Sequence, residues 1–211
     1  MITIIDYGSG NLRSVAKALE KSGGTVRISH HPEEILQADR IVLPGVGAFG
    51  DCRANLEQAQ LLQPVREHIQ KGKPFLGICV GMQLLFSEGH EFGIHPGMGL
   101  FPGKVIRFPR TMPDPGNPSL FLKVPHMGWN RVHQTTPHPL WQGIRQDTFF
   151  YFVHSFHAVA DHRHMIAGES HYGMTFLAAC ARDNLFATQF HPEKSQAAGL
   201  ELLKNFITWS P

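Results

Sequence analysis

The segment Lys73–Phe86, with the sequence KPFLGICVGMQLLF, decides the fold of this chain. Its apolar run from Pro74 to Ile78 predicts a buried strand. The unbranched apolar residues from Met82 to Phe86 favour a helix. Cys79 lies between these two elements, so we expect a sharp strand-to-helix turn at the cysteine.

Two glycines stand symmetrically around the cysteine, because Gly77 lies two residues before Cys79 and Gly81 two residues after it. This is the cysteine version of the nucleophile elbow, G-x-S-x-G in hydrolases. The turn needs glycines there because a Cβ would crowd the strand or the helix. The sulfur would then face the first helix amides, which favour a reactive thiolate. A buried, inert cysteine in an ordinary loop explains this segment equally well.

The composition indicates a globular protein, since 42% of the 211 residues are hydrophobic and 17% are charged. We expect one domain over residues 1–211, because no linker, repeat or low-complexity tract divides the chain. A net charge of +2 gives no electrostatic case for nucleic acid. No apolar run approaches the ~20 residues that cross a membrane, and the first residues do not resemble a secretion signal.

The three cysteines are an odd number without a CxxC pair, which favours a reducing compartment. We therefore expect a cytoplasmic protein without disulfides. Fourteen histidines suggest a metal site, but His90 and His95 are one residue too far apart for HExxH, and Gly93 between them opposes a helix. We expect no metal and no cofactor. Gly8–Arg13 imitates a dinucleotide fingerprint but lacks its third glycine.

The first half of the chain has the pattern of alternating strands and helices. Strands are expected at Ile2–Ile5, Thr25–Ser29 and Arg40–Leu43, and helices after Asn11, at 32–36 and at 56–70 with a break near Pro64. The third strand ends in the glycine-rich loop 44–50, at the sheet edge where α/β proteins bind ligands. Gly45 and Gly47 could aim the Val46 N–H into a cleft, although a plain turn fits as well.

The second half contains strand-like segments too close together for parallel crossovers, so several must form hairpins. They are expected at 104–108, 130–133, 149–153, 165–169, 175–181 and 185–189. The proline-rich segment Arg110–Ser119 predicts an exposed loop. We therefore predict an α/β fold whose mixed central sheet has helices on both faces and antiparallel strands in its second half.

The last predicted strand leads into His191-Pro192-Glu193, before a helix with Leu200, Leu203, Phe206 and Ile207 on its inner face. Pro192 restricts His191 to extended backbone, where residues two apart point the same way. The Glu193 carboxylate could then hold one imidazole nitrogen while the other faces a nucleophile. By itself, this motif also fits a surface histidine beside an unrelated acid.

Together these motifs resemble the class I, triad-type glutamine amidotransferases. The resemblance rests on 77–83 (GICVGMQ), 43–49 (LPGVGAF) and 189–195 (QFHPEKS). Three further segments, 6–12 (DYGSGNL), 124–130 (VPHMGWN) and 151–155 (YFVHS), are similar to the glutaminase subunits of imidazole glycerol phosphate synthase, in histidine biosynthesis. The resemblance spans nearly the whole chain and implies a flavodoxin-like, single-domain amidotransferase fold.

The resemblance implies roles for individual residues. Cys79 would attack the carboxamide of L-glutamine to form a thioester, His191 would carry protons, and Glu193 would orient His191. The N–H groups of Val80 and Val46 would hold the oxyanion. Residues that match glutamine-binding positions are Gly47, Gln83, Glu91, Ser155 and Phe156, the last of which replaces the usual Tyr.

The resemblance also implies a partner, a (β/α)8-barrel cyclase that forms a heterodimer with this chain and receives its ammonia. The cyclase would use this ammonia to make imidazole glycerol phosphate and AICAR. Asn11, Trp129 and Lys194 match positions that face the cyclase. Alternatives are an amidotransferase of another pathway or a silent regulatory subunit of the same fold. A silent subunit would be expected to lack part of the triad, which is present here.

Overall fold

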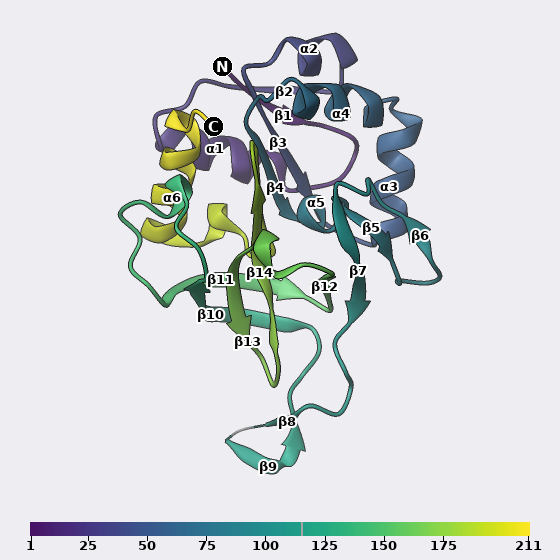
Figure 1. The fold of residues 1–211 in the computed structure, drawn as a ribbon, viewed down its shortest axis with the longest axis vertical. Coiled ribbons are helices and arrows are strands. Elements are labelled where there is room, and N and C mark those ends of the chain that lie inside the picture. Colours follow the sequence, from purple (N-terminus) through teal and green to yellow (C-terminus); the bar gives the residue numbers. More distant parts are fainter. Residues whose placement is uncertain (115) are drawn as a thin grey trace.

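The computed structural model describes residues 1–114 and 116–211, in which nine strands form one large sheet (Figure 1). In spatial order they are β11 (Thr148–His154), β10 (His126–Gln134), β13 (Ile166–His171), β14 (Thr175–Arg182), β15 (Leu185–Thr188), β4 (Phe75–Cys79), β3 (Arg40–Gly45), β1 (Ile2–Ile5) and β2 (Val26–Ser29). Pairing is parallel from β2 to β15 and antiparallel from β15 to β11. The predicted mixed sheet is confirmed.

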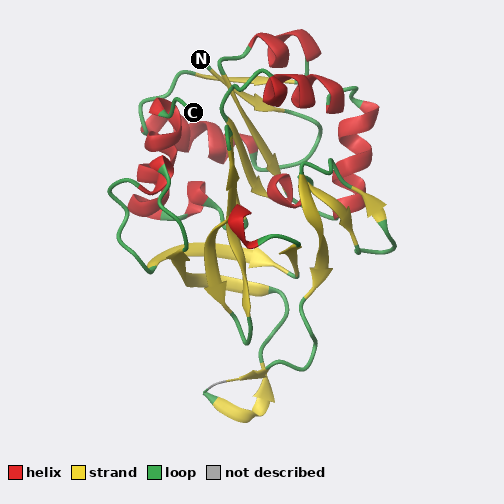
Figure 2. Cartoon of the chain, in the orientation of Figure 1, coloured by secondary structure: helices red, strands yellow, loops and turns green. Residues whose placement is uncertain are grey.

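Helices cover both faces of the parallel half, as expected for strands that are apolar throughout (Figure 2). They are α1 (Leu12–Lys21), α2 (Pro32–Gln37), α3 (Phe49–Gln58), α4 (Leu62–Gln70), α5 (Val80–Gln83) and α6 (Gln196–Thr208). In Figure 1, α1 and α6 lie together on one side of β1, β3 and β4, and α3 and α4 lie on the other. Asn11 caps α1, because its side-chain oxygen accepts a hydrogen bond from the Ser14 N–H.

A second sheet was not predicted. It contains β12 (Phe156–Ala160), β7 (Phe101–Arg107), β5 (Phe86–Gly89) and β6 (His95–Pro96). The predicted helix at Met82–Phe86 is wrong, because α5 ends at Gln83 and Phe86 begins β5. Leu84 and Leu85 are fully buried in a turn, and their carbonyls accept hydrogen bonds from the N–H groups of residues 98, 100 and 101. Where every residue of a short run is apolar, the hydrophobic periodicity cannot distinguish a helix from a turn.

The predicted helix at 56–70 is two helices. The chain breaks at Gln60, whose φ is 58°, rather than at Pro64. Pro64 lies in the first turn of α4, where the missing N–H costs no intrahelical hydrogen bond. The predicted loop Arg110–Ser119 contains most of a small hairpin, β8 (Pro113–Asp114) with β9 (Asn117–Phe121), which projects from the body in Figure 1. Pro115 of that loop lies outside the described residues.

No helix within the described residues is both long enough and apolar enough to span a membrane.

Candidate active site

Cys79 lies at the sharp turn that the flanking glycines predicted. It ends β4 and precedes α5, with a φ of 56° and a ψ of −111°. A Cβ added at Gly81 would lie 1.8 Å from the Leu43 carbonyl oxygen, and one at Gly77 would lie 2.9 Å from the Gly81 oxygen. Neither position can hold a larger residue without moving the backbone. Close packing of β4, α5 and β3 therefore fixes the position of the cysteine.

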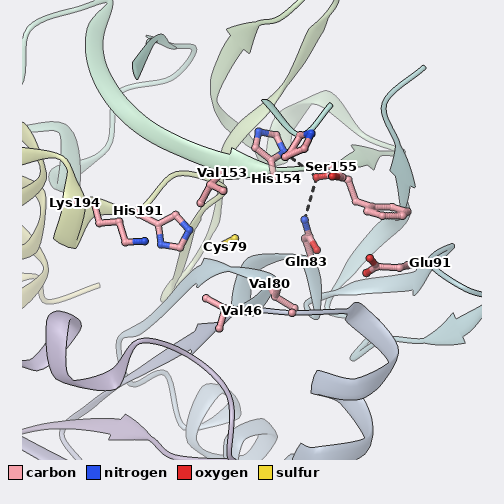
Figure 3. Close-up of a pocket in the computed structure, with 13 residues that line it drawn as sticks. Val46, Cys79, Val80, Gln83, Glu91, Val153, His154, Ser155, His191 and Lys194 are labelled. Carbon is pink, nitrogen blue, oxygen red and sulfur yellow. Dashed lines mark hydrogen bonds between the residues drawn. The ribbon is translucent and has the colours of Figure 1, made fainter. Parts of the chain in front are cut away.

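A cavity of about 370 Å³ opens at the carboxyl ends of β3 and β4, beside Cys79 (Figure 3). Its lining includes Val46, Gly47, Cys79, Val80, Gln83, Glu91, Pro125, Val153, His154, Ser155, Phe156, His191 and Lys194. All five residues predicted to bind glutamine line this cavity together with Cys79 and His191. The fold therefore brings together side chains that are more than 100 residues apart in the sequence.

His191 and Glu193 form a buried pair at the edge of the cavity. Their Nδ1 and Oε1 atoms are 2.8 Å apart, and their side chains are 3% and 1% exposed. His191 has the expected extended backbone, with a φ of −100° and a ψ of 97°, but the extended segment does not continue to Glu193, because Pro192–Lys194 forms a 3-10 helix in which the Lys194 N–H donates to the His191 carbonyl. Proline suits the first position of such a turn as well as it suits a strand. The turn, and not strand alternation, brings the two side chains together.

The charges around His191 favour its protonated form. Burial lowers the imidazole pKa, but the charge of Cys79, a hydrogen bond with Cys79 and the Glu193 carboxylate together raise it from 6.5 to about 10. Among the described residues, His191 Nε2 makes no hydrogen bond of standard geometry, so its contact with Cys79 is a loose one. Since Nδ1 faces Glu193, Nε2 is the nitrogen that can exchange a proton with a reacting group in the cavity.

The two predicted oxyanion donors are the N–H groups of Val80 and Val46, and they differ in whether a hydrogen-bond acceptor already occupies them. Val80 is the first residue of α5, where a backbone N–H has no intrahelical acceptor. The Val46 N–H donates to the Ser9 hydroxyl oxygen at 3.3 Å. The Val46 carbonyl accepts from the same hydroxyl and from the Cys52 thiol. The Val46 N–H is therefore occupied by Ser9, and its role as an oxyanion donor stays a prediction.

Two of the three predicted interface residues contact the same ring, that of Tyr151. Trp129 is 45% exposed and contacts Tyr151 edge-on, with 6.1 Å between ring centroids. Lys194 Nζ lies 5.7 Å from the centroid of the same Tyr151 ring. Asn11 is exposed at the start of α1, a helix that packs against the 3-10 helix containing Lys194. The partner-facing role of these residues remains a prediction.

One buried side chain next to Cys79 was missed by the sequence analysis. Gln189 is fully buried, and its Nε2 lies 3.6 Å from Cys79 Sγ. Its Oε1 accepts a hydrogen bond from Gln83 Nε2 at 3.0 Å. Gln189 opens the segment 189–195 that contains His191 and Glu193. Its position two residues before the histidine was the available signal, but the sequence did not show which way the side chain points.

Comparisons with known proteins show the family of this chain. The model of the family described as glutamine amidotransferase class-I matches residues 3–209. The imidazole glycerol phosphate synthase subunit HisH of Syntrophotalea carbinolica is 52% identical over 98% of each chain. The HisH subunit of Nitrosomonas europaea is 50% identical, over 100% of this chain and 99% of its own.

Solved structures show the same fold at lower identity. The structure of PurLQS from Thermotoga maritima covers 97% of this chain and 94% of its own, with a TM-score of 0.72 and 18% identity. A crystal structure of a glutamine amidotransferase covers 98% and 97%, with a TM-score of 0.71 and 16% identity. This chain belongs to the class I glutamine amidotransferases and, within them, to the family of HisH subunits of imidazole glycerol phosphate synthase.

Proposed function

We propose that this chain hydrolyses L-glutamine to glutamate and ammonia and delivers the ammonia to a (β/α)8-barrel cyclase in histidine biosynthesis. The observation that carries the proposal is the buried His191–Glu193 pair, whose free imidazole nitrogen shares a cavity with Cys79 at a strained turn. The family supports the pathway, because its members are named as subunits of imidazole glycerol phosphate synthase.

In the first step the Cys79 sulfur attacks the side-chain carbonyl carbon of glutamine. A tetrahedral intermediate forms, and its oxyanion accepts hydrogen bonds from the Val80 N–H and, after the loop rearranges, from the Val46 N–H. Each such donor is worth about 3 kcal/mol at the transition state. The imidazolium of His191 gives its Nε2 proton to the departing nitrogen. Ammonia leaves and a γ-glutamyl thioester remains on Cys79.

In the second step the neutral His191 takes a proton from water, and the resulting hydroxide attacks the thioester carbonyl. The carbon–sulfur bond breaks, glutamate leaves and the thiolate–imidazolium pair is restored. Glu193 keeps the ring in one orientation through both steps, because its Oε1 holds Nδ1. One histidine thus acts first as an acid and then as a base.

The cavity has acceptors suited to the ammonium group of glutamine. Both N–H groups of Gln83 are engaged, with Phe156 O and Gln189 Oε1, so its Oε1 is left for a donor. Glu91 accepts from the Phe49 N–H with Oε2, which leaves Oε1 for the same purpose. Gly47 and Ser155 line the cavity beside them, and Phe156 contributes backbone without the hydroxyl of the usual Tyr.

The proposed function also needs a partner that receives the ammonia. Ammonia in water at neutral pH is mostly ammonium, which is not a nucleophile, so direct transfer to the cyclase protects the product. We propose a heterodimer whose contact surface includes Trp129 and Lys194 around Tyr151, with Asn11 nearby. The loop at Val46 and Gly47 is the proposed switch, since turning the Val46 N–H from Ser9 toward Cys79 would complete the oxyanion hole.

Replacing Cys79 by Ala tests the chemistry. In the assembled complex, Cys79→Ala should abolish glutamine-dependent synthesis and leave synthesis from added ammonium salts at the wild-type rate. Cys180→Ala is the matched control, because this thiol is fully buried in β14 and does not line the cavity. Loss of both activities in Cys79→Ala would contradict the thioester mechanism.

Replacing Trp129 or Lys194 by Ala tests the contact surface. Binding to the cyclase or coupling of the two activities should weaken about tenfold or more if either residue is a hot spot. The melting temperature should change little, because both side chains are exposed. A large fall in melting temperature with normal coupling would show that these residues are structural.

A further inference from the structure

Beside the cavity, which His154 also lines, polar side chains that the proposed mechanism does not use form a largely buried row of hydrogen bonds. Asn130 Nδ2 lies 3.3 Å from His126 Nε2, and His126 Nδ1 lies 3.0 Å from His154 Nε2. His154 Nδ1 lies 2.8 Å from the Phe156 carbonyl oxygen. Both histidines are buried, at 3% and 6% exposure. The row thus runs from β10 to the first residue of β12.

The row continues from Phe156 to the sulfur of Cys79. Gln83 Nε2 donates to the Phe156 oxygen at 3.1 Å and to Gln189 Oε1 at 3.0 Å. Gln189 Nε2 then donates to Cys79 Sγ at 3.6 Å. The dashed lines from His154 and Gln83 converge on this backbone oxygen in Figure 3. We call the row from Asn130 to Gln189 the amide–histidine relay.

The Phe156 carbonyl fixes the direction of every bond in the relay. A carbonyl oxygen only accepts, so His154 Nδ1 and Gln83 Nε2 must both donate. A neutral His154 then accepts at Nε2 from His126 Nδ1, and a neutral His126 accepts at Nε2 from Asn130. Asn130 Nδ2 also donates to the His171 carbonyl at 2.8 Å.

The neutral forms that this pattern requires are the favoured ones. Burial lowers the pKa of His126 to about 4 and that of His154 to about 3. The Gln189 amide is equally constrained, because turning it over would set an N–H against the Gln83 N–H and an oxygen against the sulfur. Each hydrogen in the relay therefore has one position, and the final N–H points at the nucleophile.

We propose that Gln189 is a positioning residue for the Cys79 nucleophile and that the relay holds its amide in the donating orientation. This inference rests on the proposed glutaminase function. The donated N–H adds a fixed partial positive charge beside Sγ and so restricts the direction in which the sulfur can attack. His191 supplies the proton, and Gln189 limits the movement of the sulfur.

The test compares Gln189→Met and Gln189→Glu with the wild type, each assembled with the cyclase. Methionine has a similar volume but removes both hydrogen bonds, and glutamate keeps the acceptor for Gln83 but removes the donor to sulfur. We expect kcat for glutamine hydrolysis to fall about tenfold or more in both, with KM changed less than about threefold. Gln63→Met, at an exposed glutamine of α4, should leave both constants unchanged.

Two further measurements separate positioning from folding. Synthesis from ammonium salts should stay at the wild-type rate, which shows an intact complex. Alkylation of Cys79 by iodoacetamide without glutamine, followed by peptide mapping, should slow in both variants. A variant with a lower melting temperature but wild-type kcat and alkylation would overturn the proposal. If the wild-type complex does not hydrolyse glutamine, the proposed function fails, whereas the alkylation rates still test Gln189.

The far end of the relay gives an independent test. Asn130→Asp keeps the shape but cannot donate to His126 Nε2, so the histidine branch loses its outer hydrogen bond and holds the Phe156 carbonyl less firmly. We expect a lower kcat, and we expect Asn130→Asp combined with Gln189→Met to be no slower than the slower single variant. If the two effects multiply, the relay does not act through Gln189. Asn184→Asp, at a buried amide that contacts only backbone carbonyls of residues 69 and 73, is the control for folding and should leave kcat unchanged.

Discussion

The turns that follow the neighbouring strands β3 and β4 are built in opposite ways. At the β4 turn, Cys79 is 5% exposed and Gly81 packs directly against the Leu43 carbonyl. At the β3 turn, Val46 is 45% exposed, and a Cβ added at Gly47 would meet no atom within 4 Å. Dense packing fixes the proposed nucleophile, whereas the proposed second oxyanion donor, the Val46 N–H, is held by the Ser9 hydroxyl.

The β4 turn must stay fixed, whereas the β3 turn can change its conformation. Displacing the β4 turn would force buried backbone atoms into one another. Releasing Val46 from Ser9 breaks one hydrogen bond from its N–H and one to its carbonyl, and each is worth only ~1 kcal/mol net. Contacts with a partner protein can supply that much free energy. The nucleophile can thus be ready in a chain whose oxyanion hole is incomplete.

Gly81→Ala should have the largest effect. The added Cβ would lie 1.8 Å from the Leu43 oxygen, which is backbone and cannot move alone. We expect a loss of more than ~4 kcal/mol in the free energy of unfolding, or no folded protein. Urea denaturation measures it, with Gly72→Ala, which meets open space at a φ of 73°, as the control. A stable Gly81→Ala protein would show that the elbow is not fixed by packing.

Acid should destabilise the fold through histidines that are buried or half-buried. Burial lowers the pKa of His68, His126 and His138 to about 4 and that of His154 to about 3. The unfolded chain binds these protons near pH 6.5, so this stability is complete above about pH 6.5 and is lost as the pH falls through about 4. We expect the melting temperature to be roughly 5–10 °C lower at pH 5 than at pH 7.5.

The Ser9–Val46 contact joins a hydroxyl to backbone groups that do not titrate in that range, so a change in pH should leave this contact intact. His68→Gln, on α4 away from the cavity, should reduce the acid sensitivity without changing kcat. Equal melting temperatures at the two pH values would contradict the neutral, buried histidines.

Gly47→Ala should have a moderate effect on stability and a larger one on activity. A φ of 106° is strained for alanine, although the side chain has open space, so we expect a loss of about 1–3 kcal/mol. Gly23→Ala is the matched control, because it has a φ of 95°, equally open space and no contact with the cavity. Similar stability losses with a fall in glutaminase kcat only in Gly47→Ala would support a functional loop.

Ser9→Ala should have the smallest effect on stability, about 1 kcal/mol in the free energy of unfolding, because water can replace the exposed hydrogen bonds that it removes. Since it frees the Val46 N–H, glutamine hydrolysis without the cyclase should rise severalfold. Ser22→Ala is the control, because its hydroxyl bonds two backbone carbonyls elsewhere on the molecule. Unchanged hydrolysis in Ser9→Ala would show that the hydroxyl does not restrain the donor.

Several features of the site could be predicted because they depend on neighbours in sequence. The glycines around Cys79 predicted the turn, since a turn this sharp excludes Cβ atoms at fixed positions. The pairing of His191 with Glu193 was also predicted, but for the wrong reason. Extended backbone and a 3-10 turn each bring these two side chains together, and only the structure distinguishes them.

By itself, the sequence determined the strands of the large sheet, the glycine-dependent turn and, through family motifs, the proposed glutamine-binding residues that line the cavity, because these follow from local sterics, hydrophobic runs and motifs. The tertiary structure alone decided the end of α5 at Gln83, the contact of Ser9 with Val46 and the direction of the Gln189 amide. Each of these depends on atoms contributed by distant segments. Burial and hydrogen-bond partners across such distances exist only after the chain has folded.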